Sequence, residues 1–186
     1  MRVRDVLVEV ARIAEGNELS KKIQDKEDFL DEQVKEKIDI LLKCYNAVLK
    51  DITTNYYEYV TSVNVLEKSK NLLDLEEPLI KIISITNTKG QPINYEVKGD
   101  LLTTDFAPFV ICYKALAVNQ AIDDEFMFSG RAIGDGVFVY GVLSEYLMRE
   151  FRFDEAQSWE SKFRQAVSFR TDYKKRKLKA GKRWGL

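Results

Sequence analysis

Histidine is absent from the 186 residues of this chain, which also contain only 2 cysteines and 3 prolines. Without imidazole, the commonest general base, the Ser-His and Cys-His nucleophile pairs and most zinc or iron sites are excluded. The two thiols, Cys44 and Cys112, each lie inside an apolar segment, where cysteine usually serves as a small hydrophobic side chain in a reducing compartment. The sequence therefore favours a protein that is not an enzyme and that needs no metal or other cofactor.

Long apolar runs are also missing. No stretch approaches the roughly 20 residues that a membrane-spanning helix needs, and Arg2, Arg4 and Asp5 interrupt the pattern of a secretory signal. Hydrophobic residues nevertheless make up 45% of the chain, which is enough for the core of one domain of roughly 100 to 200 residues. We therefore expect a soluble domain that neither spans a membrane nor is conventionally secreted.

The charges are distributed unevenly along the chain. Of the 29 basic residues, seven lie in residues 174–186, which contain no acidic residue; the remaining 22 face 30 acidic residues, a net charge of −8. An acidic body, residues 1–173, is therefore followed by a basic C-terminal tail, residues 174–186. The candidate partner-binding residues lie in this tail: Lys174, Lys175, Arg176, Lys177, Lys179, Lys182, Arg183, Trp184 and Leu186.

Hydrophobic spacing predicts helices in both outer parts of the chain. Residues 17–29 are polar and predict a connector. Asp154, with Gln157 three residues later, has the pattern of a capping box, and the short connection before it predicts an antiparallel helical hairpin. The segments with helical spacing of apolar residues are 2–15, 34–52, 137–150 and 154–170.

The middle of the chain changes to the alternation that is typical of strands. This pattern predicts a small antiparallel sheet within residues 57–117, with turn chemistry at residues 87–90. The expected fold class is therefore α+β: mainly a bundle of about four helices, with an antiparallel β insert between the second and third main helices. The whole of residues 1–173 would form this domain.

Two further features can be interpreted as sites. Residues 129–136 superficially resemble a phosphate-binding loop before a helix, but they lack the Gly-Lys-Ser/Thr element and Asp135 would repel a phosphate. The acidic clusters offer oxygen ligands for a hard cation, although such groups at loops and helix starts are more often solvated or capping. An enzyme that uses carboxylates and a divalent metal remains a third-ranked hypothesis. The clusters are Glu27-Asp28, Asp123-Asp124-Glu125 and Asp154-Glu155.

Three segments carry a resemblance to a known family. They are MRVRDVL at residues 1–7, LLKCYNAVL at residues 41–49, and GVLSEYLMREFRFDEAQSWESKFRQAV at residues 141–167. The last reads as a helix, a brief turn and a second helix with Glu155, Ala156 and Trp159 near its start. Together with the order of elements, these segments resemble the head-to-tail adaptor proteins (connector or head completion proteins) of tailed bacteriophages.

The resemblance implies a structural protein of the virion, located at the head-tail junction and assembled in the cytoplasm of the host bacterium. Such proteins form a homo-oligomeric ring, typically a dodecamer, between the portal protein and the tail or a second adaptor. DNA passes through the channel of the ring without specific binding, and an acidic wall suits this passage. By the same resemblance, the basic tail would order on the portal protein, with Trp184 as its anchor.

The basic tail also supports an alternative function. Seven cations within residues 174–186 would pair with phosphates and give a salt-dependent affinity for nucleic acid. The alternative is therefore a small nucleic-acid-binding module that acts through its C-terminal tail. The sequence leaves both hypotheses open.

Overall fold

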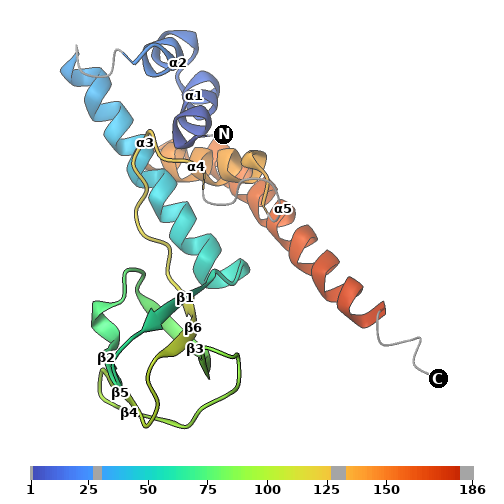
Figure 1. Ribbon diagram of the computed structural model, residues 1–186. Coiled ribbons are helices and arrows are strands. Elements are labelled where there is room, and N and C mark those ends of the chain that lie inside the picture. Colours follow the sequence, from blue (N-terminus) through green and yellow to red (C-terminus); the bar gives the residue numbers. More distant parts are fainter. Residues whose placement is uncertain (1, 27–30, 127–132, 181–186) are drawn as a thin grey trace. The chain divides into compact units, whose positions relative to one another are not determined.

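The computed structural model describes residues 2–26, 31–126 and 133–180, and residues 169–180 by their backbone alone. The chain divides into two compact units. Unit 1 comprises Met1–Asp51 and Asn119–Leu186, and unit 2 comprises Ile52–Val118. In the described residues, all α-helices belong to unit 1 and all strands belong to unit 2 (Figure 1).

In the described residues, unit 1 is built from five α-helices. The helices are α1 (Val3–Ala14), α2 (Asn17–Gln24), α3 (Glu32–Asp51), α4 (Asp135–Arg149) and α5 (Phe153–Ala180), of which α4 is buried on most of its sides. Asp5 accepts a hydrogen bond from the Arg2 backbone N–H (2.8 Å) and so caps the start of α1. Gly16, at a φ of 91°, makes the turn from α1 to α2, a backbone conformation that glycine adopts at little cost.

The helix α2 corrects one expectation. Residues 17–29 were predicted to be a connector, but Asn17–Gln24 is helical and buries Leu19, Ser20 and Ile23. Two apolar residues are too few for the helical period to show in the sequence. The burial arises from tertiary packing, which stabilises most short helices.

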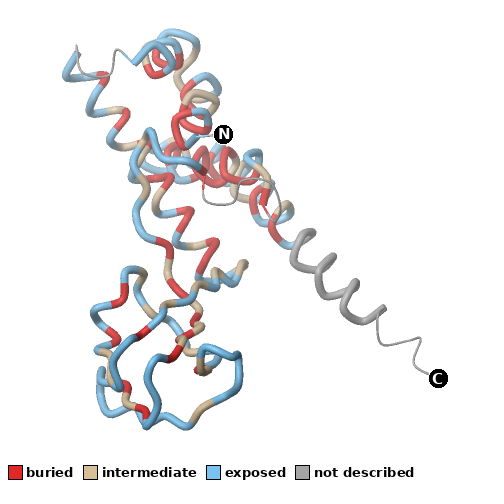
Figure 2. The backbone as a smooth tube through the Cα atoms, in the orientation of Figure 1, coloured by how far each residue is buried: buried red, intermediate tan, exposed pale blue. Residues whose placement is uncertain are grey.

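Aromatic side chains form much of the core of unit 1. Tyr45 of α3 and Phe138 of α4 are fully buried, with ring centroids 5.5 Å apart. Phe126, from the segment before α4, meets the Phe138 ring edge-on at 4.8 Å. Figure 2 shows the resulting stripes of buried residues along the described helices. The Tyr45 hydroxyl donates to Gln120 (2.7 Å), so the polar end of this buried ring is satisfied.

Unit 2 contains two antiparallel sheets of three strands. The first has the order β1-β6-β3, with β1 at Val60–Val65, β3 at Leu79–Asn87 and β6 at Phe109–Ala115. The second has the order β2-β5-β4, with β2 at Ser69–Asn71, β4 at Tyr95–Lys98 and β5 at Leu101–Thr104. A π-helical turn, Ile52–Tyr56, and a 3-10 turn, Leu72–Asp74, complete the unit.

The two sheets share one hydrophobic core. Alternate residues of β6, including Phe109 and Ile111, are buried together with Ile85 of β3 and Leu102 of β5. Because both sheets and the 3-10 turn contribute to this cluster, unit 2 has a core of its own.

The expected fold class is therefore wrong. The described residues form five α-helices and six strands in two sheets, not a mainly helical bundle of about four helices with one small sheet. Alternation in residues 93–98 marked β4 of the second sheet, but β2 and β5, of three and four residues, are too short for alternation to mark them.

Helix length and hydropathy also bear on membranes. Across the residues that the structure describes, no helix combines the length and the apolar character needed to cross a bilayer.

Candidate functional site

The basic residues singled out in the sequence begin inside a helix. The α5 backbone continues to Ala180, so Lys174, Lys175, Arg176, Lys177 and Lys179 lie on helical backbone, and their side chains are outside the described part. The remaining candidates, Lys182, Arg183, Trp184 and Leu186, lie outside the described residues. A helix has about 3.6 residues per turn. Residues 174–179, which contain five of the seven cations, therefore span about two turns.

The acidic cluster at residues 123–125 contacts the first turn of α1. Arg4 is buried and donates to both carboxylate oxygens of Asp123, at 3.0 and 3.3 Å. It also donates to the Ile23 carbonyl at 2.7 Å, and Lys26 lies 3.7 Å from Asp123. The hydrogen bond from Arg4 lowers the pKa of Asp123 below its ordinary value. Asp123 is therefore engaged by two cations of the same chain, Arg4 and Lys26.

Two of the other acidic candidates have partners for their side chains, and two lie outside the described residues. Asp124 accepts a hydrogen bond from the Ala121 N–H (2.6 Å), and Glu155 pairs with Arg152. Glu27 and Asp28 lie outside the described residues. In residues 2–26, 31–126 and 133–180, no group of three or more His, Cys, Asp or Glu side chains is placed to hold a metal.

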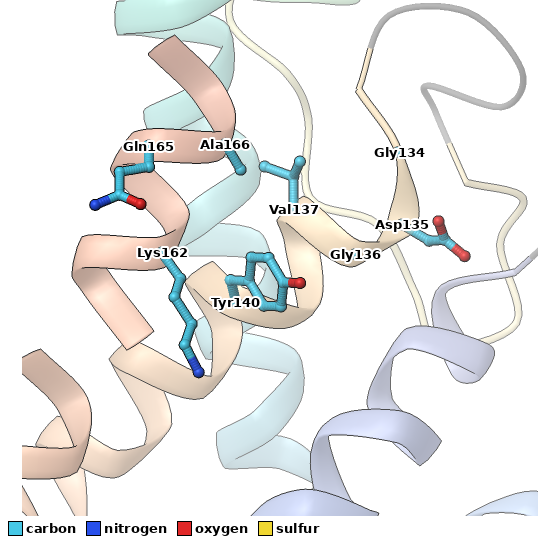
Figure 3. Close-up of a pocket in the computed structure, with 8 residues that line it drawn as sticks. All are labelled: Gly134, Asp135, Gly136, Val137, Tyr140, Lys162, Gln165 and Ala166. Carbon is cyan, nitrogen blue, oxygen red and sulfur yellow. The ribbon is translucent and has the colours of Figure 1, made fainter. Parts of the chain in front are cut away.

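An open pocket lies where the N-terminal end of α4 faces α5 (Figure 3). Figure 3 shows the side chains of Val137 and Ala166 meeting between the helices, whereas Asp135 and Gln165 point outward in opposite directions. A Cβ on Gly136 would meet nothing within 4 Å. The lining residues are Gly134, Asp135, Gly136, Val137, Tyr140, Lys162, Gln165 and Ala166.

The wall of this pocket is aromatic and cationic. The Tyr140 ring lies 5.6 Å from the Trp159 ring, and Lys162 Nζ lies 3.7 Å above Trp159, a cation–π contact. No serine, cysteine or threonine lines the pocket. An open hollow with one amine and an apolar floor suits the side chain of a partner better than an enclosed substrate.

A polar junction joins the helices of unit 1. Glu15, at the end of α1, accepts hydrogen bonds from Lys37 of α3 and from the Tyr146 hydroxyl of α4 (2.8 Å). Burial alone would raise the pKa of Glu15, but the bonds from Lys37 and Tyr146 and the charges of Lys37 and Arg152 lower it below its ordinary value. Burial and the bond to Glu15 raise the pKa of Tyr146. Glu15 is therefore a structural carboxylate.

The cysteines are both free, one in each unit. Cys44 is fully buried in α3, and burial raises the pKa of its thiol to about 11. Such a thiol is unreactive near neutral pH. Cys112 is partly exposed on β6.

Sequence reasoning missed three surface features. These are the α4–α5 pocket, the exposed aromatic pair Phe151 and Phe153, and the exposed isoleucines Ile80 and Ile83 of β3. The only signal in the sequence was the FRF run of residues 151–153 in the short connection between two helices, because aromatic residues are uncommon in an exposed turn. The pocket has no local signal, since its walls come from two helices.

No protein-family model matches the sequence, and no curated protein matches it significantly.

Proposed function

We propose that this chain is a structural protein of the virion of a tailed bacteriophage, an adaptor at the head-to-tail junction. It forms a ring beneath the portal protein, contacts the tail or a second adaptor on its other side, and surrounds the channel through which DNA passes. The protein works by binding its neighbours and catalyses no reaction.

The observation that carries this proposal is the segment of residues 141–167, whose pattern resembles that family. In the structure this segment forms most of the hairpin α4–α5. Its features have defined roles there: Ala156 is fully buried, and Trp159 packs on Tyr140. The residues that carry the resemblance are therefore residues that build the hairpin.

Exposed apolar side chains give further support. Leu66, Leu73, Phe106 and Phe151 are all more exposed than buried, and both units contain such residues. Large apolar groups on a surface commonly mark sites where other proteins bind. The carboxylate Asp123, which could have served an enzyme, is instead paired with Arg4.

The test mixes the purified protein with the portal protein of the same phage and images the mixture by negative-stain electron microscopy. We expect a ring of additional density on the portal. Removal of residues 174–186 should abolish the ring, and Trp184→Ala should weaken binding by about 2 kcal/mol or more if Trp184 is the anchor. Portal particles that stay bare at saturating concentrations of the intact chain would refute the proposal.

The alternative, a nucleic-acid-binding module, rests on the basic residues at the end of α5. It predicts binding to duplex DNA that weakens steeply between about 50 and 200 mM salt. Removal of residues 174–186 should abolish this binding as well. DNA affinity that is unchanged by the truncation would exclude the alternative, while loss of portal binding in the same variant would favour the adaptor.

A further inference from the structure

The connection between α4 and α5 exposes a cluster of apolar side chains. We define the hairpin tip as Met148, Glu150, Phe151, Phe153 and Asp154. Phe151 is 79% exposed, and its ring lies edge-on to that of Phe153, with centroids 6.1 Å apart. Met148 and Phe153 are also among the exposed large apolar residues.

Phe151 is an unfavourable residue for the fold at this position. The end of α4 is closed by hydrogen bonds from the Phe151 N–H to Met148 (3.3 Å) and from the Arg152 N–H to Leu147 (2.9 Å), the pattern of a Schellman motif. Phe151 has a φ of 58°, the left-handed conformation in which glycine is favoured. A side chain that is both exposed and in this conformation does not stabilise its own subunit, which points to a contact outside it.

The hairpin tip carries two acidic side chains. Arg152, between Phe151 and Phe153, donates two hydrogen bonds to Glu155, at 2.8 and 2.6 Å, so its charge is paired within the same chain. Arg149, at the end of α4, is exposed, and its charge offsets part of the negative charge. Glu150 and Asp154 are exposed beside the aromatic pair. The tip therefore combines apolar area with negative charge.

Unit 2 carries a surface of the opposite charge. The side chains on the outer side of the sheet β1-β6-β3, away from its core, include two lysines and no acidic residue. Lys81 and Lys114 are register partners on neighbouring strands, and Lys114 donates to the Thr54 carbonyl (3.1 Å). We define the outer sheet face as Val60, Ser62, Asn64, Ile80, Lys81, Ile83, Ser84, Thr86, Val110, Cys112 and Lys114.

The outer sheet face is also apolar. The register of β3 shifts between Leu79 and Lys81 and again between Ile82 and Ser84. Each bulge adds an isoleucine to the exposed side of the strand, Ile80 and Ile83. With Val60 these side chains are between 43% and 50% exposed. Two lysines directly opposite each other repel within one sheet, and an acidic partner would relieve that repulsion.

We infer that the hairpin tip of one copy of this protein binds the outer sheet face of a second copy. Phe151 and Phe153 pack on Val60, Ile80 and Ile83. Glu150 and Asp154 pair with Lys81 and Lys114, which sets the orientation of the contact. Each surface thus supplies apolar area and the charge that the other lacks.

The two surfaces of this contact differ, so each copy has one of each to offer. Such a heterologous contact repeats from copy to copy and closes into a ring when the rotation allows it. The inference deepens the proposed function, and rests on it for the closure of the ring. It names the surfaces through which neighbouring subunits of the adaptor ring would bind.

A pair of charge-reversal variants tests this contact in the full-length protein. The face variant carries Lys81→Glu and Lys114→Glu, and the tip variant carries Glu150→Lys and Asp154→Lys. By sedimentation velocity at low salt and rising protein concentration, we expect the wild type to self-associate and each variant alone to associate at least tenfold more weakly. An equimolar mixture of the two variants should recover the wild-type association, because each variant then meets a complementary partner.

Two controls separate the contact from folding and from total charge. Lys89→Glu with Lys98→Glu makes the same charge change in unit 2 but away from the outer sheet face, and should associate as the wild type does. Phe151→Gly should lose association while its thermal midpoint stays the same or rises, because glycine suits the left-handed position. In the wild type, alkylation of Cys112 should slow as the protein concentration rises.

The outcomes distinguish this contact from the proposed function. Face and tip variants that associate as the wild type does, a mixture that stays monomeric, or a wild type that stays monomeric throughout would each overturn the contact. Rescue in the mixture supports the contact even if no ring forms on portal particles, a result that would refute only the adaptor. If the face variant alone or the tip variant alone still formed a ring on portal particles, this result would support the adaptor and refute the contact.

Discussion

Gly141 lies in α4 where two neighbouring helices leave no room for a side chain. A Cβ at this position would stand 2.8 Å from Cγ1 of Val48 and 3.1 Å from the ring of Phe163. We expect Gly141→Ala to lower the free energy of unfolding by about 1–3 kcal/mol, because the surrounding helices must shift to relieve the overpacking. Chemical denaturation followed by circular dichroism measures this change.

Gly136, in the first turn of the same helix, is the matched control. A Cβ there meets nothing within 4 Å, so Gly136→Ala should leave stability unchanged or raise it by about 0.4–1 kcal/mol. If the two substitutions had equal effects, the close packing at Gly141 would not be the cause.

The contribution of Glu15 to the stability of the fold should depend on pH. Its pKa in the folded protein is lowered, so its contribution to stability is present above its ordinary pKa and is lost as the pH falls through the lowered value. At neutral pH, Glu15→Gln should reduce the free energy of unfolding by about 1–3 kcal/mol, because two donors lose a charged acceptor.

The difference between wild type and Glu15→Gln should shrink on acidification below the ordinary range of glutamate and vanish once Glu15 is protonated. Denaturation curves of both proteins across this range measure the difference. A constant difference at all pH values would mean that the ionised carboxylate is not what stabilises the junction.

The roles of such single residues were only partly predictable. The apolar stripe of residues 34–52 correctly predicted buried positions such as Tyr45 and Leu49. The partners of Glu15 were not predictable, because Tyr146 lies 131 residues away in the sequence. The crowding at Gly141 also depends on which helices meet there, and no local pattern encodes that.

At the scale of elements, Arg4 attaches α1 to two other segments. Its guanidinium reaches the Ile23 carbonyl at the end of α2 and Asp123 in the loop before α4. Arg4→Met keeps an apolar stem but leaves the Ile23 carbonyl without this donor, which should cost about 1–3 kcal/mol of stability. Hydrogen exchange of the α1 amides should become faster.

Arg12 supplies the control on the same helix. It pairs with Glu9 on the surface, and Arg12→Met should leave both stability and the exchange of α1 unchanged. Equal effects of the two substitutions would show that α1 does not depend on the buried contacts of Arg4.

Elements with strong periodicity were predicted well, and short ones were not. The helical spacing of residues 34–52 and 137–150 corresponds to α3 and α4 within a few residues. The helix α2 and the strands β2 and β5 were not predicted, because eight or fewer residues show too little of a period. The hairpin tip and the outer sheet face could not be predicted from the sequence either, because the geometry of a turn and of β-bulges defines them.

At the scale of the whole molecule, each unit has a core of its own. Phe109 is fully buried in the core of unit 2, and Phe109→Ala should destabilise that unit by about 3–5 kcal/mol. We expect hydrogen exchange to accelerate in β1, β3 and β6 while α1 and α4 keep most of their protection. Equal loss of protection in both units would show that they unfold as one.

The β insert that the sequence predicts, within residues 57–117, lies inside unit 2, Ile52–Val118. Hydrophobic patterning predicts which residues are buried but not which core they join. That the strands surround a cluster of their own, which includes Leu102 and Phe109, is known only from the structure.

The ends of unit 2 lie close together. The Ala117 N–H donates to the Thr53 hydroxyl (3.5 Å), and the Ala115 N–H donates to the Tyr59 carbonyl (2.9 Å), so the chain enters and leaves this unit at neighbouring points. A module with adjacent termini can be exchanged, enlarged or deleted in evolution with little disturbance to its host. Replacement of unit 2 in the course of evolution would therefore give such a protein a new surface while the helices of unit 1 are kept.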